Sequence, residues 1–166
     1  MSLFGLKVAK QFGEGLPSFK NQSEAETILF KQRDENLRQL LEMAKTSEIF
    51  VPDFTPEILK SLEKWYFELY ESNGFSKYAK TREKFESCMA AYFGEVVIRN
   101  CPDARWTVRE FAFENGKYEI GVQKKLLHFM SKFTDHYKQP NNKRHQKIFG
   151  IFNQLFASRG LAGAAN

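Results

Sequence analysis

An Asn-Gly pair, Asn115 and Gly116, separates two stretches in which apolar and polar residues alternate, and it is the strongest local signal in the chain. Such a pair favours a two-residue type I′ turn, because both residues tolerate a positive φ. The pattern predicts an antiparallel β-hairpin with strands at about 105–114 and 117–123. A chain with this element has to place the apolar face of the hairpin against something else.

The predicted register places Phe111 and Ile120 opposite each other on one apolar face. Trp106 and Val108 then point to the other face, which a regular hairpin would leave in water. Either a β-bulge near Glu110 reverses the alternation, or the second face is also covered. We expect the bulge.

Most of the remaining chain has the helical period, with apolar residues recurring every three or four positions. Caps and stop signals divide this pattern into five amphipathic helices, predicted at about 23–46, 55–73, 76–100, 124–139 and 141–160. We therefore predict an α+β fold that is predominantly helical, with about five amphipathic helices packed with one antiparallel hairpin. The helix at 76–100 is expected at the centre, and Gly94 in its interior is expected to admit the hairpin closely.

The chain length of 166 residues is typical of one domain. We predict a single helical α+β domain at 23–160, preceded at 1–22 by an extension or a short helix and followed at 161–166 by a frayed tail. Lys7 and Lys10 interrupt the apolar N-terminus, so neither a signal peptide nor a membrane span is expected. A cytoplasmic protein that does not bind a membrane is predicted.

Cysteine and histidine usage gives little sign of a metal or cofactor. Cys88 and Cys101 do not have the spacing of a zinc site, and we expect His128, His136 and His145 to be surface or rim residues. Phosphate-binding, dinucleotide-binding and hydrolase motifs are missing from the sequence. No cofactor, no metal site and no catalytic residue is therefore assigned.

The most informative acid is Glu95, which stands beside core-facing residues, with Arg99 four positions later, where an ion pair can form along a helix. A carboxylate partly withdrawn from water is either paired or protonated, and perturbed acids are enriched at functional sites. A structural pair and a functional acid both remain open. The candidate interaction or structural site comprises Tyr92, Gly94, Glu95, Arg99, Trp106 and Arg109.

Positive charge is concentrated at the C-terminal end. Residues 1–123 contain 17 Lys and Arg against 19 Asp and Glu, whereas 124–166 contain eight basic residues and one acid, Asp135. A basic surface of this kind is able to bind phosphates, or it serves only solubility. The candidate basic patch comprises Lys124, Lys125, Lys132, Lys138, Lys143, Arg144 and Lys147.

The sequence AAYFGEVVIRN, followed by Trp106 and the Asn-Gly pair, resembles a pattern seen in uncharacterised small bacterial proteins. These proteins have a helix bearing Tyr and Gly-Glu, followed by a hairpin with a Trp-bearing strand. The resemblance covers residues 85–123. Some similar small α+β proteins serve as binding or immunity partners, so it draws attention to Tyr92, Gly94, Glu95 and Trp106.

These observations favour a non-catalytic bacterial interaction protein that binds a protein partner near the hairpin and the helix at 76–100. Nucleic-acid binding through the basic C-terminal helices is the alternative, and an enzyme that uses Glu95 is a distant third. An uncovered hairpin edge would also permit a homodimer.

Overall fold

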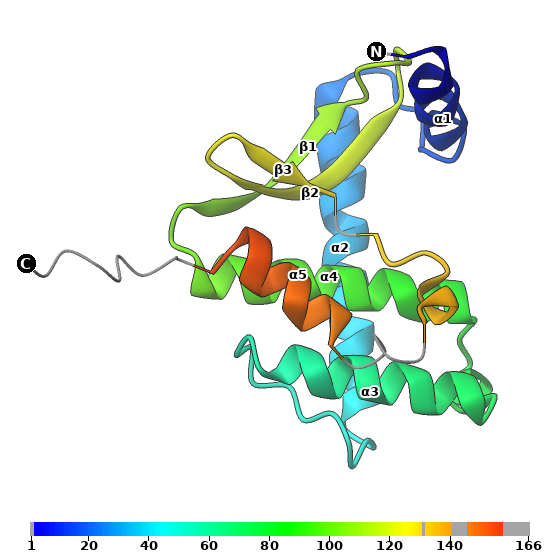
Figure 1. The fold of residues 1–166 in the computed structure, drawn as a ribbon, viewed down its shortest axis with the longest axis vertical. Helices are drawn as coiled ribbons and strands as arrows, with labels where there is room; N and C mark the ends of the chain where they lie inside the picture. The colour runs from blue at the N-terminus through cyan, green and yellow to red at the C-terminus, as the bar shows by residue number, and fades with distance from the viewer. Residues whose placement is uncertain (1, 131, 141–145, 158–166) are drawn as a thin grey trace, which may run out of the picture.

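The computed structural model describes residues 2–130, 132–140 and 146–157 (Figure 1). Over these residues the chain forms five α-helices, two 3₁₀ helices and a three-stranded antiparallel sheet, so the predominantly helical α+β class is confirmed. The elements in chain order are α1 (Leu3–Glu14), α2 (Gln22–Ala44), α3 (Ile58–Glu71), η1 (Gly74–Tyr78), α4 (Arg82–Asn100), β1 (Ala104–Glu110), β2 (Tyr118–Lys124), β3 (Leu127–Phe129), η2 (His136–Lys138) and α5 (Lys147–Leu155).

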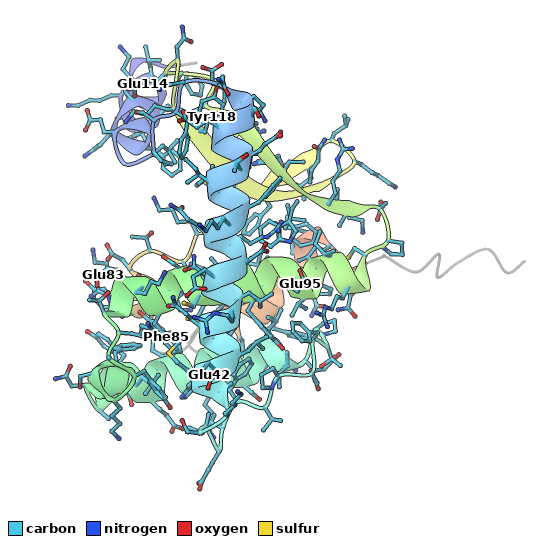
Figure 2. The ribbon with its side chains drawn as sticks, turned by 180° about the vertical axis from the view of Figure 1, so that it is seen from behind. Glu42, Glu83, Phe85, Glu95, Glu114 and Tyr118 are labelled. Carbon is cyan, nitrogen blue, oxygen red and sulfur yellow. The ribbon has the colours of Figure 1, made fainter. Side chains whose placement is uncertain are left out.

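The elements are arranged around the crossing of two long helices. In Figure 1 the sheet lies at one end of the molecule, α3 lies at the other, and α4 and α5 lie between them. Helix α2 runs along the long axis and crosses α4, which Figure 2 shows from behind. Helix α4 is the central element, because its buried residues include Phe85, Met89, Tyr92 and Phe93. The expectation of a central helix in this part of the chain is confirmed.

The predicted helix at 76–100 is interrupted near its start. Residues 74–78 form the 3₁₀ helix η1, and Ala79 then takes a left-handed conformation with φ 52°. Helix α4 begins only after Thr81, whose side chain accepts a hydrogen bond from the N–H of Lys84 at 3.1 Å. This side-chain cap satisfies an N–H that has no partner within the helix, which fixes the starting point.

The predicted hairpin exists, but its register and turn were wrong. Strand pairing is regular from Ala104 opposite Lys124 to Glu110 opposite Tyr118, without a bulge. In this register Trp106 lies opposite Val122, and both point to the same covered face. The predicted strand of 105–114 therefore ends at Glu110, four residues earlier than expected.

Contacts with the N-terminal part of the chain explain the difference. Phe111 packs against Phe12 of α1, with ring centroids 5.7 Å apart. The N–H of Tyr118 donates to the carbonyl of Pro17, and the carbonyl of Gly116 accepts from the N–H of Phe19. Gly116 has a positive φ of 77°, as the Asn-Gly signal predicts, but it belongs to a longer loop. Tertiary contacts have thus overridden the local turn preference.

The predicted helix at 124–139 is wrong. The chain instead turns at Lys125, where φ is 54°, and returns as the short strand β3 beside β2. Leu127 and Phe129 pack against the core, whereas Leu126 is fully exposed. Packed and exposed side chains alternate along this stretch, as in a strand. The helix-like spacing of its larger apolar residues does not reflect a helix.

The structure describes a helix near each end of the chain. Residues 3–14 form α1, the short helix allowed for in the N-terminal segment, and residues 147–155 of the predicted last helix form α5. The predicted start of that last helix at 141–145 and the predicted frayed tail at 161–166 lie outside the described residues.

Gly94 sets the distance between the sheet and α4. A Cβ atom on Gly94 would lie 2.0 Å from a ring carbon of Trp106, so only glycine permits this contact. The close approach expected at Gly94 is therefore present. Gly150 in α5 is the natural comparison, because a Cβ there would meet nothing within 4 Å.

Changing Gly94 to Ala is predicted to lower the free energy of unfolding by about 2 kcal/mol, because Trp106 has to move. Changing Gly150 to Ala is predicted to raise it by up to about 1 kcal/mol through helix propensity alone. Urea denaturation of both variants measures the two effects. A gain in stability for Gly94→Ala would contradict the packing of Trp106 on α4.

Candidate binding cleft

A cleft of about 250 Å³ lies between α2, α4 and the sheet. Its apolar lining residues come from all three of these units and from the segment after β3: they are Leu29, Ala90, Ala91, Trp106, Ile120 and Phe133. Polar residues complete the lining: they are Gln32, Arg33, Asn36, Glu83, Glu86, Ser87, Lys132 and Thr134. An apolar floor with a few polar groups around it is the usual composition of a binding site.

The cleft exists because one face of α4 carries small side chains. Ser87, Ala90, Ala91 and Gly94 are three or four positions apart and therefore lie on one face of the helix. At Gly94 the ring of Trp106 fills the space between helix and sheet. Ser87, Ala90 and Ala91 line the cleft, together with Trp106 and Phe133.

Glu86 connects the cleft to a buried polar cluster, which we define as Glu63, Tyr66, Glu86 and His136. Glu86 is 3% exposed, and one carboxylate oxygen accepts a hydrogen bond from the Tyr66 hydroxyl at 2.7 Å. Its two oxygens also accept the backbone N–H groups of Asp135 and His136, at 3.1 and 3.3 Å. Burial and the hydrogen bond to Glu86 raise the pKa of Tyr66, so its hydroxyl stays a donor.

Glu63 holds the same part of the chain from α3. Its carboxylate is fully buried, lies 2.8 Å from Nε2 of His136 and accepts the N–H of Ile148 at 3.1 Å. The buried polar cluster therefore attaches η2 and the start of α5 to α3 and α4. Because the cluster holds His136 in place, it also positions Phe133 and Thr134, which lie shortly before His136 in the chain and line the cleft.

The six candidate residues from the sequence do not form one site. Tyr92, Glu95 and Arg99 lie on α4 around Phe54, whose N–H donates to the Tyr92 hydroxyl at 3.1 Å. Glu95 forms the expected ion pair with Arg99 at 3.0 Å, and the Arg99 guanidinium lies 3.5 Å from the centroid of the Phe54 ring. Because Phe54 has a positive φ of 60°, these contacts hold a strained residue in place.

The other three candidate residues lie on or against the sheet. Gly94 and Trp106 are in contact, and Trp106 lines the cleft. Arg109 points to the opposite face of the sheet, where its Nε pairs with Glu119 at 2.5 Å. Figure 2 shows Glu95 and Glu83 on opposite sides of the crossing helix α2, so Glu95 lies away from the Glu83 end of α4 that lines the cleft.

The face of the sheet turned away from the helices contains a second polar group. Thr107 Oγ1 lies 3.0 Å from Nδ1 of His128, whose Nε2 lies 3.7 Å from Glu119. Burial and the nearby Arg109 guanidinium lower the pKa of His128, and Glu119 offsets part of this effect. The side chains of His128 and His136 are only 6% and 2% exposed, which corrects the expectation of surface or rim residues; His145 lies outside the described residues.

The candidate basic residues are spread over the molecule. Lys124 donates to the carbonyl of Phe156 at 2.7 Å at the end of α5, whereas Lys147 begins that helix. Lys132 lines the cleft, and Lys138 pairs with Asp135 at 2.8 Å. Lys125 is exposed in the β2–β3 turn, while Lys143 and Arg144 lie outside the described residues.

Two further features bear on the kind of site. Within the described ranges, no three His, Cys, Asp or Glu side chains are grouped so that they could hold a metal ion. None of the helices described is both long and apolar enough to cross a membrane.

Comparison with known proteins shows a family relationship. A family model described as uncharacterised protein YwmA matches residues 18–156. The uncharacterised protein YwmA of Bacillus subtilis (strain 168) is 28% identical over 151 residues, which cover 90% of this chain and 94% of that relative. No solved structure matches. The resemblance to an uncharacterised bacterial family is confirmed, and it extends well beyond residues 85–123.

Removing the Glu63 carboxylate is predicted to be strongly destabilising. In Glu63→Ala the buried His136 ring and the N–H of Ile148 lose their acceptor, and we expect a loss of about 3–5 kcal/mol in the free energy of unfolding. The matched control is Glu42→Ala, which removes an exposed ion pair with Lys45 and should change stability little. Chemical denaturation compares the two, and equal effects would show that the buried pair is dispensable.

His128 is predicted to make stability depend on pH. Because the folded protein disfavours protonated His128, the unfolded chain binds this proton more readily, at its ordinary pKa of about 6.5. The stability that the neutral form contributes is present above this pH and is lost as the pH falls. The free energy of unfolding should therefore decline less on acidification in His128→Gln than in the parent protein. Parallel declines in urea titrations at several pH values would contradict this assignment.

Proposed function

Because this chain belongs to the YwmA family, whose description gives no activity, we propose a function from its own geometry. We propose that it is a binding protein, and that it receives an apolar side chain of a protein partner in the cleft between α2, α4 and the sheet. The observation that carries this proposal is the open apolar floor formed by Ala90, Ala91 and Trp106.

The size of the cleft favours one large side chain. A volume of about 250 Å³ is small for an organic cofactor but sufficient for a leucine or phenylalanine side chain. Burying such a side chain contributes about 1.5–3 kcal/mol, which corresponds to millimolar or weaker binding by itself. A partner protein would therefore need further contacts around the cleft, as a hot-spot residue in a larger interface has.

The polar residues of the lining suit a peptide chain. Gln32 and Asn36 on α2 carry amide groups that can donate to and accept from a peptide backbone, and Ser87 and Thr134 add hydroxyl groups. Nucleic acid is a less suitable ligand, because the basic candidates that the structure describes are divided between the two ends of α5, η2, the β2–β3 turn and the cleft. A contiguous positive surface would be needed to follow a phosphate backbone.

The experiment is a titration of isotope-labelled protein with the blocked peptide N-acetyl-Gly-Phe-Gly amide, followed in nitrogen–proton correlation spectra. The indole N–H signal of Trp106, which lines the cleft, is expected to shift with the peptide. The indole signal of Trp65, which is 2% exposed in the core, is expected to stay in place and serves as an internal reference.

A pair of matched variants locates the binding. Ser87→Phe places a ring at the exposed polar edge of the cleft and should reduce the affinity at least severalfold, since it occupies the space that the peptide needs. Ser23→Phe makes the same change at an exposed position of α2 outside the cleft and should leave the affinity unchanged. A Trp106 signal that stays unmoved, or equal affinities in the two variants, would overturn the proposed function.

A further inference from the structure

Taking the proposed function as its basis, we infer that the segment bound in the cleft carries a carboxylate next to its apolar side chain. The partner is thus a protein that presents an acidic and an apolar residue side by side. The inference comes from the charges around the cleft and from one polar atom that has no partner.

Lys132 supplies the first positive charge. Its side chain is exposed and lines the cleft, and its ammonium group lies 5.4 Å from the centroid of the Phe12 ring. Among the described residues, no carboxylate lies within 4.0 Å of this ammonium group. A ligand carboxylate would give it an ionic partner.

Arg33 supplies the second positive charge from α2. Its guanidinium carbon lies 5.3 Å from the centroid of the Trp106 ring and 4.7 Å from that of Phe30, so the side chain is held beside the cleft. Its only ion pair in the described structure is with Asp34. The Asp34 side chain is 66% exposed, so this ion pair is weak. The remaining N–H groups of the guanidinium can donate to a ligand oxygen.

The acids of the lining are already engaged. Glu83 pairs with Arg82 at 2.7 Å, and Glu86 accepts hydrogen bonds from Tyr66 and from the backbone of η2. Neither carboxylate is therefore available to pair with a ligand cation without losing an existing partner. The pair of Glu83 with Arg82 is as exposed as the pair of Arg33 with Asp34, so neither pair holds its charges strongly. Lys132 is the charged residue of the lining without an ionic partner in the described structure, and its positive charge complements an anionic group.

Trp106 provides an independent observation. Its indole nitrogen is buried, and no hydrogen-bond acceptor for it occurs in the described part of the chain. A buried N–H without an acceptor is unfavourable, and an oxygen of a bound ligand would satisfy it. Trp106 lines the cleft, and a ligand oxygen would reach its buried indole nitrogen only if the ring turned toward the cleft.

The test compares two peptides that differ only in charge: N-acetyl-Gly-Phe-Asp amide and N-acetyl-Gly-Phe-Asn amide. Asp and Asn have nearly the same shape, so any difference in affinity reports the carboxylate. Two partly exposed ion pairs correspond to a preference for the Asp peptide of about three- to tenfold at low salt. The preference should shrink in about 1 M salt, where the screening length falls to about 3 Å.

Charge variants then identify the residues responsible. In the double variant Arg33→Gln, Lys132→Gln the two peptides should bind equally, and in Arg33→Glu, Lys132→Glu the Asn peptide should bind more tightly. The control is Lys20→Gln, Lys31→Gln, which removes two exposed cations outside the cleft and should keep the preference. Phenylacetate, a small-molecule source of the same chemistry, should bind more weakly than the Asp peptide because it lacks the peptide backbone.

The outcomes separate the two proposals. If both peptides bind in the cleft with the same affinity, the inference about the carboxylate is overturned and the proposed function stands. A preference for Asp that survives in the Gln double variant also overturns the inference, since other charges would then be responsible. If neither peptide moves the Trp106 signal, the proposed function itself fails. Tighter binding of phenylacetate than of the Asp peptide would point to a small-molecule ligand and overturn the inference as well.

Discussion

The contact between Trp106 and Gly94 determines how the sheet sits on the helices. It brings the aromatic ring to the backbone of α4 at a position where any other residue would clash. The rest of the same helix face carries the small residues Ser87, Ala90 and Ala91, which line the cleft together with Trp106 and Phe133. One stripe of small residues therefore has two consequences: close packing at the Gly94 end and an open cleft at the Ser87 end. The opposite, core-facing side of α4 has large residues instead, among them Phe85 and Met89.

The buried carboxylates give the C-terminal part of the chain a fixed position that apolar packing alone would leave less defined. Glu86 and Glu63 accept backbone N–H groups at η2 and at the start of α5. Directed acceptors of this kind specify position, although burying a carboxylate costs solvation energy that only full hydrogen bonding offsets. Since Glu86 also lines the cleft, the position of the segment carrying Phe133 is linked to the shape of the cleft.

Sequence reasoning identified the fold class and most helices because caps and apolar periods are local signals. It missed the strand register, because Phe111 and Tyr118 make contacts with residues 12–19, about a hundred positions away. It also missed the buried polar cluster, although one signal was present. Glu63 lies on the same helix face as the core residues Leu59 and Tyr66, a position at which an acid requires a buried partner. The partner, His136, was assigned to a helix that does not form.

Sequence reasoning recognised some residues of the cleft but did not predict the cleft itself. Trp106 and Gly94 were recognised as positions of interest, and a close approach of the hairpin at Gly94 was expected from a glycine within a helix. That Trp106 makes this contact was not predicted. The place of Ala90 and Ala91 in the cleft depends on which residues of the sheet face them, and only the correct register of β1 and β2 determines those residues. In the predicted register Trp106 pointed away from Ile120, whereas in the structure both line the cleft. A three-residue error in strand pairing is therefore enough to hide a cleft whose residues are all visible in the sequence.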